Sequence, residues 1–405
     1  MKPFSAPASA GADLASPAVI AFVIEELTVG GAERMVVDMA NVFAEHGWEV
    51  HMVLLRSAGE LASELDSGVH QYVLNKKPGI DLRLPYRLFR CISNIDPLAV
   101  NSHLCVGNTW TRLSLFFTRR KVVATEHSRD SWKPLYYRWM DRILAWRTAS
   151  LVAVSADTAE FYRDTIGVPD DLLTVINNGV DTRAYASGDG RQLRESWLAP
   201  DNETSDTAAS QKIVIGTVGR LVIAKNHRRL IDAVKMLVTD SLLERHVIRL
   251  VIVGDGEDRE SIESYVQSQN LSSTVLFTGA RHDIPDVLSA FDLFALSSDR
   301  EGHPLTALEA QAAGTPVVLT NAGGSGEAIA YFEDQAGGVL VDCSAEALAE
   351  ALREMILDPE LRAERAEFAH RYALAHFDKL RMVQRYATVF HTPSAKLARL
   401  TDDTI

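Results

Sequence analysis

Short apolar runs alternate with amphipathic segments along the whole chain, a pattern typical of parallel sheets whose strands are joined by helices. In the first half, the runs that predict strands are residues 19–24, 50–55, 98–101, 121–125 and 151–154. In the second half, they are residues 213–218, 248–253, 275–278, 293–296 and 316–319. The pattern therefore predicts an α/β protein with two successive sheets.

A polar stretch between the two sets of strands, residues 181–212, contains the sequences SGDG and DNETSDTAAS and indicates a domain junction near Asp181. We expect a first domain over residues 17–181 and a second over 182–378, with a mobile loop at 201–210. The first sixteen residues are rich in Ala, Ser and Pro, and they lack the basic start and long apolar run of a signal peptide. Residues 1–16 are therefore expected to form a flexible tail.

Length and composition narrow the class of protein. A chain of 405 residues is too long for one ordinary core, and its hydrophobic content of 47% is usual for a globular protein. A net charge of −13 argues against general affinity for nucleic acid or anionic membranes. Cys91, Cys105 and Cys343 lack metal-ligand spacing, which favours a reduced, cytoplasmic setting. No apolar run approaches the roughly 20 residues of a membrane span.

The segment EGHPLTALE, Glu301 to Glu309, carries two carboxylates on either side of a proline. Pro304 suits the first position of a helix, so free backbone N–H groups around Pro304, Leu305 and Thr306 would attract an anion. Glu309 could accept two hydrogen bonds from a vicinal diol such as a ribose. The segment thus predicts a nucleotide site, although two glutamates on a surface helix can also be merely solvated charges.

A second phosphate signal lies upstream in GRLVIAK, Gly219 to Lys225, which follows the predicted strand at 213–218. Arg220 and Lys225 fall in one loop at the carboxyl end of that strand. Arg220 as a fork and Lys225 as a point charge could bracket a diphosphate. Two independent segments therefore predict the same ligand chemistry.

These motifs resemble those of the retaining glycosyltransferases of family 4, which have the GT-B fold of two Rossmann-like domains with parallel sheets facing across a cleft. The second half matches in GRLVIAKN (219–226), VIVGDGE (251–257), FTGARHDIPDVLSAFDLFALSS (277–298), EGHPLTALEAQAAGTPVV (301–318) and GGSGEAI (323–329). The first half matches more loosely in TVGGAERMV (28–36), TEHS (125–128), VAVSADT (152–158) and INNGVD (176–181). The resemblance covers nearly the whole chain and implies that a final helix, within residues 379–405, crosses back onto the first domain.

The resemblance also assigns roles to residues. It implies that Glu301 contacts sugar hydroxyls, that Glu309 binds the ribose, and that His127 of TEHS donates a hydrogen bond to the transferring sugar. His127, Glu301, Arg220 and Lys225 are then the catalytic candidates. The donor site would comprise Gly219, Arg220, Lys225, Asp255, Gly256, Arg281, Glu301, Gly302, His303, Pro304, Leu305 and Glu309.

Several of these positions also have plainer interpretations. The Gly30–Gly31 loop could hold a phosphate or an acceptor hydroxyl, or form only a tight turn. The loop of Arg281 and Asp283 holds the nucleobase edge in the family, but the two side chains can also be a surface ion pair. His303 stands where the family often has an aromatic residue, and Gln311 where methionine is frequent.

The segment SWKPLYYRWMDRILAWR, residues 131–147, mixes aromatic residues with Lys133, Arg138, Arg142 and Arg147. A basic aromatic helix of this kind can lie at the inner face of a membrane and bring a lipid-borne acceptor to the site. The alternative is a helix, including Trp132, that packs its aromatics on the first domain.

The sequence therefore predicts transfer of a hexose from a nucleotide diphosphate sugar to a hydroxyl on a saccharide or lipid-linked acceptor, with retention at the anomeric carbon. No metal site and no further cofactor are expected. Two alternatives are an epimerase acting on a nucleotide sugar and a non-catalytic nucleotide-sugar-binding protein. A nicotinamide oxidoreductase is disfavoured, because VGDGED, with Gly254 and Gly256, lacks the third glycine of a dinucleotide motif.

Overall fold

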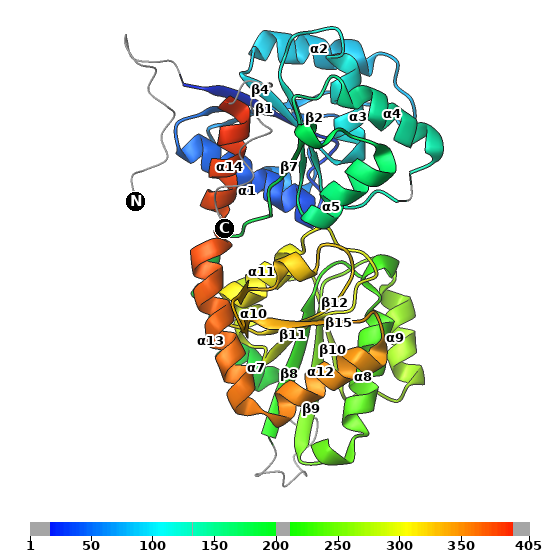
Figure 1. Ribbon diagram of the computed structural model, residues 1–405. Helices are drawn as coiled ribbons and strands as arrows, with labels where there is room; N and C mark the ends of the chain where they lie inside the picture. The colour runs from blue at the N-terminus through cyan, green and yellow to red at the C-terminus, as the bar shows by residue number, and fades with distance from the viewer. Residues whose placement is uncertain (1–16, 132, 200–210, 392–405) are drawn as a thin grey trace. The chain divides into compact units, whose positions relative to one another are not determined.

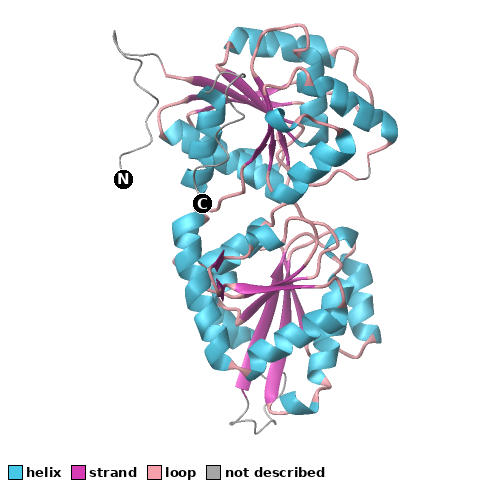
Figure 2. Ribbon diagram, in the orientation of Figure 1, coloured by secondary structure: helices cyan, strands magenta, loops and turns pink. Residues whose placement is uncertain are grey.

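The computed structural model describes residues 17–131, 133–199 and 211–391 (Figures 1 and 2). The tail expected at 1–16, the loop expected at 201–210 and Trp132 lie outside the described residues. The chain forms two compact units. The first comprises the residues up to Gly179 together with those from Lys379 onward, and the second is Val180–Asp378.

The first unit contains a seven-stranded parallel sheet in the order β3-β2-β1-β4-β5-β6-β7. The α-helices of the first unit are α1 (Gly31–Glu45), α2 (Leu84–Ile95), α3 (Leu104–Ser114), α4 (Leu135–Ala145), α5 (Ala156–Phe161) and α14 (Lys379–His391). The strands are β1 (Val19–Ile24), β2 (Glu49–Leu54), β3 (Val69–Val73), β4 (Ala99–His103), β5 (Val122–Glu126), β6 (Ser150–Ala153) and β7 (Leu173–Val175).

Both faces of this sheet are covered, which explains why its central strands are continuous apolar runs. Leu84 and Leu88 of α2 pack with Val23 and Val100 on one face. On the other face α14 packs beside α1, where the rings of Phe43 and Phe390 lie 5.6 Å apart. The Lys121 ammonium donates hydrogen bonds to the last carbonyls of α14, at Val389 and Phe390.

The second unit has a six-stranded parallel sheet in the order β10-β9-β8-β11-β12-β15. Helices α8, α9 and α12 cover one face, and α10, α11 and α13 lie on the other (Figure 1). The strands are β8 (Gln211–Val218), β9 (His246–Val253), β10 (Val275–Gly279), β11 (Leu293–Leu296), β12 (Val317–Thr320) and β15 (Gly338–Val341), with a hairpin of β13 (Tyr331–Phe332) and β14 (Gln335–Ala336). The helices are α6 (Thr182–Ala186), α7 (Arg191–Trp197), α8 (His227–Val238), α9 (Arg259–Ser268), α10 (Ile284–Ser289), α11 (Leu305–Ala312), α12 (Ala345–Leu357) and α13 (Pro359–His376).

The two sheets share one topology, since in each the first strand lies between the second and the fourth. This is the doubly wound Rossmann arrangement, whose ligands bind at the carboxyl ends of the strands where the winding reverses. In the second unit that point lies between β8 and β11, and in the first between β1 and β4. The predicted α/β fold with two Rossmann-like domains is confirmed.

Candidate active site

The two segments predicted to bind phosphate meet at the reversal point of the second sheet. Lys225 ends a short 3₁₀ helix, Ile223–Lys225, in the loop after β8. Its Nζ lies 2.6 Å from Oε1 of Glu301, which stands in the loop after β11. Ser298 Oγ donates to the same carboxylate oxygen at 2.5 Å. The structure therefore brings Lys225 and Glu301 into direct contact.

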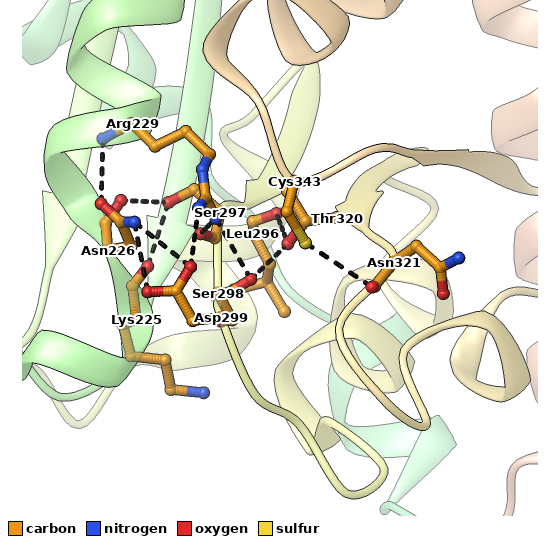
Figure 3. A network of polar contacts seen from close by, with 10 residues as sticks. All are labelled: Lys225, Asn226, Arg229, Leu296, Ser297, Ser298, Asp299, Thr320, Asn321 and Cys343. Atoms are coloured by element: carbon orange, nitrogen blue, oxygen red, sulfur yellow. Dashed lines mark hydrogen bonds and ion pairs between the residues drawn. The ribbon is translucent and has the colours of Figure 1, made fainter. Parts of the chain in front are cut away.

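A network of polar contacts holds these two loops together (Figure 3). The hydroxyl of Ser297 donates to the carbonyls of Lys225 and Asn226, at 3.0 and 2.9 Å. Arg229 donates to the Ser297 carbonyl at 2.7 Å and pairs with Asp299 at 2.6 Å. Because the backbone on both sides of the ion pair is fixed, Lys225 and Glu301 occupy defined positions before any ligand binds.

The segment GGSGEAI also lies beside Glu301. Glu301 N donates to the carbonyl of Ala322 at 2.9 Å, and Gly324 N donates back to the Glu301 carbonyl at 3.2 Å. Gln311 of α11 completes this region, because its amide binds the carbonyls of Ala307 and Ala328 and accepts from Ala330 N. The buried Gln311 side chain thus connects α11 to the neighbouring loop by hydrogen bonds.

Helix α11 begins one residue later than predicted. Pro304 is its N-cap residue, with φ −68° and ψ 113°, and the first helical residue is Leu305. The fixed φ of proline suits either position, and the extended ψ decides for the cap. Within the described part of the chain, no group accepts a hydrogen bond from the backbone N–H of Leu305 or Thr306. An anion-binding helix start therefore remains, shifted by one residue.

The other residues of this motif are buried. Gly302 and His303 are enclosed, and Nε2 of His303 lies 3.2 Å from the Glu327 carbonyl oxygen. Burial lowers the pKa of His303 to about 4, so its ring is neutral at pH 7. Glu309 is buried on the same helix, α11.

The glycines after β9 have a packing role. A Cβ on Gly254 would lie 2.0 Å from the Gly219 carbonyl oxygen, and one on Gly256 would lie 2.3 Å from that of Leu221. These glycines therefore let the loops after β8 and β9 touch, which explains the pattern VGDGED without a dinucleotide.

The charged residues around this pair of loops are separated. Asp255 pairs with Arg259 at 3.0 Å, and Arg281 pairs with Asp283, with Nε 2.8 Å from Oδ1. Arg220 is exposed and makes no ion pair with a described residue. Among the predicted cations, only Lys225 is held against Glu301.

In the first unit, Gly30 is the N-cap of α1, directly after the exit from β1. A Cβ on Gly30 would lie 2.4 Å from a carboxylate oxygen of Glu33, which occupies the first turn. A carboxylate is stabilised at a helix start but repels a phosphate. Of the two ligands considered for the Gly30–Gly31 loop, the geometry thus favours a hydroxyl.

His127 follows β5 and contacts a second histidine. Its Nε2 lies 3.2 Å from Nδ1 of His103, the last residue of the neighbouring strand β4. Burial lowers the pKa of His127 to about 4, and burial together with the His127 ring lowers the pKa of His103. His103 was not predicted, because a single histidine outside any motif carries no signal.

Comparisons with known proteins agree with this architecture. The family model described as "Glycosyltransferase Family 4" matches residues 29–184, and that described as "Glycosyl transferases group 1" matches residues 200–372. The putative glycosyltransferase EpsF of Bacillus subtilis (strain 168) is 30% identical over 316 residues, covering 74% of this chain and 78% of that protein. The chain belongs to the family 4 glycosyltransferases.

Other relatives of this glycosyltransferase differ in their reactions. N-acetyl-alpha-D-glucosaminyl L-malate synthase of Bacillus anthracis is 23% identical over 90% of the chain and 94% of that protein. An Escherichia coli UDP-Gal:alpha-D-GlcNAc-diphosphoundecaprenol alpha-1,3-galactosyltransferase is 31% identical, but the alignment spans only 55% of this chain and about half of that relative, 52%.

Solved structures show the same fold. Anabaena HepE in complex with UDP-glucose superposes with a TM-score of 0.75 at 23% identity, covering 91% of this chain and 98% of that one. WaaG, a glycosyltransferase involved in lipopolysaccharide biosynthesis, superposes with a TM-score of 0.68 at 19% identity, covering 92% and 99%. The fold is therefore GT-B, as expected.

The glycosyltransferase also contains a buried charged cluster that the sequence did not reveal. Lys133 Nζ lies 2.8 Å from Asp130 and 3.0 Å from Asp141, and Asp141 also binds Arg112 at 2.5 Å. Glu126, directly before His127, is 1% exposed in the same region. Lys133 was counted among the basic residues of a helix that could lie at a membrane, but its side chain is fully enclosed and precedes α4. The charged side chains of this cluster come from four separate segments that the fold brings together. No local sequence pattern could therefore predict the cluster.

The outer face of α4 is apolar. Tyr136, Trp139 and Ile143 are 67%, 64% and 56% exposed. With Leu113 and Phe117, the latter 97% exposed, they line a groove of roughly 460 Å³. The alternative in which these aromatics pack on the domain does not hold for these described residues. No helix in the described ranges has the length and apolarity to cross a bilayer.

Proposed function

We propose that this glycosyltransferase is a metal-independent, retaining hexosyltransferase that uses a nucleotide diphosphate sugar and a hydroxyl acceptor. The observation that carries the proposal is the Lys225–Glu301 pair, 2.6 Å apart, at the carboxyl ends of β8 and β11. A site at that point of a Rossmann sheet is where nucleotides bind. The complexes of HepE with UDP and UDP-glucose support UDP-hexoses as the first donors to try.

Glu301 and Lys225 bind different parts of the donor. Oε1 of Glu301 accepts from both Lys225 and Ser298, which leaves Oε2 for the hydroxyls of the sugar. The Lys225 ammonium has three donors and uses one on Glu301, so the others can reach the diphosphate. Arg220 and the free N–H groups of Leu305 and Thr306 would complete the stabilisation of the leaving group's charge.

In this proposal Glu309 binds the ribose, and His127 donates a hydrogen bond to the transferring sugar. The reaction takes place on one face of the sugar without a carboxylate nucleophile, and the departing phosphate helps to take the proton of the acceptor hydroxyl. Arg220, Lys225 and the start of α11 stabilise the charge of the leaving group without a metal ion. The acceptor is a saccharide or a lipid-linked glycan intermediate. The undecaprenol-linked substrate named for the E. coli relative supports the second choice.

The test measures donor turnover in Lys225→Met, with Lys225→Arg and Arg249→Lys as controls. Arg249 lies in the first half of β9, away from the carboxyl end of the strand, and binds the carbonyls of Trp197 and Ser273. We expect Lys225→Met to lower kcat/KM on the order of 10²-fold or more, because a donor aimed at the leaving group is lost. Lys225→Arg should retain part of the activity and Arg249→Lys nearly all.

Two outcomes would contradict the proposal. Unchanged turnover in Lys225→Met removes Lys225 from the site. Equal consumption of donor with and without acceptor indicates an epimerase or a hydrolase instead of a transferase.

We further propose peripheral contact of the first unit with the inner face of a membrane, through the apolar side of α4. The exposed guanidinium of Arg142 lies on the same helix and is suited to anionic headgroups. Such contact would bring the enzyme to a lipid-linked acceptor.

A further inference from the structure

His103 lies in a position that no motif and no comparison accounts for. Its side chain is fully buried at the end of β4, with the Phe22 ring 6.1 Å away. The neighbouring strand β5 pairs with β4 so that His103 lies opposite Thr125, and His127 follows two residues later, just after β5 ends. The two imidazoles lie 5.4 Å apart between centroids and are joined by the 3.2 Å contact from Nδ1 to Nε2.

The backbone after His103 is held in an uncommon conformation. Leu104, the first residue of α3, has φ +61°, a region that a residue with a branched side chain rarely adopts. Such strain persists where the surrounding structure enforces it, and it concentrates at functional sites. Here the sharp exit from β4 leaves the His103 ring at the strand end, facing His127.

The protonation of the pair is constrained. Burial lowers the pKa of both rings, and the neighbouring His127 ring lowers the pKa of His103 further. At neutral pH each ring therefore carries a single N–H. Only one proton fits between Nδ1 of His103 and Nε2 of His127, so one ring must donate and the other accept.

We propose that His103 is a positioning residue that donates its Nδ1–H to Nε2 of His127 and so keeps the proton of His127 on Nδ1. This rests on the proposed function, in which His127 donates to the transferring sugar. With Nε2 engaged by His103, Nδ1 is the only ring nitrogen of His127 left for the substrate. It can donate only in the tautomer that His103 selects. If His127 carried its proton on Nε2 instead, Nδ1 would present a lone pair to the sugar hydroxyl, and the hydroxyl would have to donate.

Three substitutions separate this role from simple packing. His103→Asn places an amide near the position of Nδ1 and can still donate to His127. His103→Gln places its amide near the position of Nε2 instead, and His103→Phe keeps a ring without any donor. We expect kcat to fall on the order of 10²-fold in the Phe and Gln variants, with a smaller change in KM, because a misplaced donor costs about that much. His103→Asn should retain most of the activity.

Two further measurements decide the point. Imidazole ¹⁵N shifts of the wild-type protein should show the Nδ1–H tautomer for both rings, a readout that needs neither a variant nor activity. In a His127→Ala background, His103→Phe should cause no additional loss of turnover. The proposal is overturned if His127 carries its proton on Nε2, if Gln rescues as well as Asn, or if the losses at the two positions add.

These outcomes also separate the proposal from the assigned function. Failure of the wild-type enzyme to transfer any sugar would defeat the function, while the tautomer measurement would still report on the pair. A His127→Ala enzyme with the same turnover as the wild type would overturn the positioning role and leave sugar transfer standing.

Discussion

Glu126 is a buried carboxylate among several other charged side chains. Lys133, Asp130, Asp141 and Arg112 surround it, and Tyr162 and Cys105 lie in the same cluster. Three carboxylates thus share two cations in a buried space, and no described residue hydrogen-bonds to Oε1 of Glu126. Burial raises the pKa of Glu126 from its ordinary value of 4.5 to about 7. The folded protein therefore holds a proton that the unfolded chain releases.

This predicts a pH dependence of stability with a definite sign. Below pH 4.5 both states are protonated, and between pH 4.5 and 7 only the folded state is, so stability falls as pH rises through that window. The Gln side chain of Glu126→Gln cannot titrate, so the variant should not lose this stability. Its free energy of unfolding should therefore rise relative to that of the wild type between pH 5 and pH 7. Urea unfolding at several pH values measures this.

The control for this experiment is Glu160→Gln on α5, where the carboxylate is exposed. Its unfolding free energy should run parallel to that of the wild type at every pH. If the unfolding free energy of Glu126→Gln also runs parallel to that of the wild type, Glu126 is already ionised in the folded state between pH 5 and pH 7.

At the scale of elements, the strands that the sequence missed have a common physical reason. β3 is an edge strand in which only Val69 is buried, so it offers no apolar run. β7 has three residues, all half-buried, and β15 is interrupted by exposed Leu340. The ten predicted strands are the more buried ones, and each is present. β10 also lies at a sheet edge, but it was predicted because Val275, Leu276 and Phe277 form an apolar run. The sequence thus reveals a strand where its side chains form such a run, which burial on both faces favours.

The same limit applies to the site. Lys225 and Glu301 were predicted because each follows a buried strand in a recognisable motif. The displacement of Pro304 by one residue, the His103–His127 contact and the Lys133 cluster were not predicted. They depend on dihedral angles and on side chains from separate strands and helices, which local patterns do not specify.

Helix α4 gives a prediction at this scale. Replacing Tyr136 and Trp139 by serine should weaken binding to anionic lipid vesicles about tenfold or more for each side chain, because each contributes at least about 1.5 kcal/mol when buried in the interface. A vesicle sedimentation assay measures the effect. The matched control replaces Tyr331 and Phe332 of the β13–β14 hairpin, which are 62% and 59% exposed. Equal binding by both double variants would show that α4 does not contact the membrane.

At the scale of the whole molecule, the chain leaves the first unit at Gly179 and returns to it at Lys379. Two consecutive helices, α13 and α14, therefore belong to different units. Phe390 of α14 is 1% exposed and contacts Phe43 of α1, whereas Phe368 of α13 is 8% exposed in the second unit. The stability of the first unit thus depends on residues that follow the whole second unit in the chain.

This arrangement can be tested by placing one cavity in each helix. Phe390→Ala should destabilise the first unit by about 3–5 kcal/mol, because a buried aromatic side chain is removed. Hydrogen exchange should then rise in α1 and β2 while protection of β8 and β9 stays unchanged. Phe368→Ala should do the reverse, and Arg381→Ala, on the exposed side of α14, should change neither. If Phe390→Ala exposes both units equally, the two units unfold as one cooperative body, and the division at Gly179 has no thermodynamic counterpart.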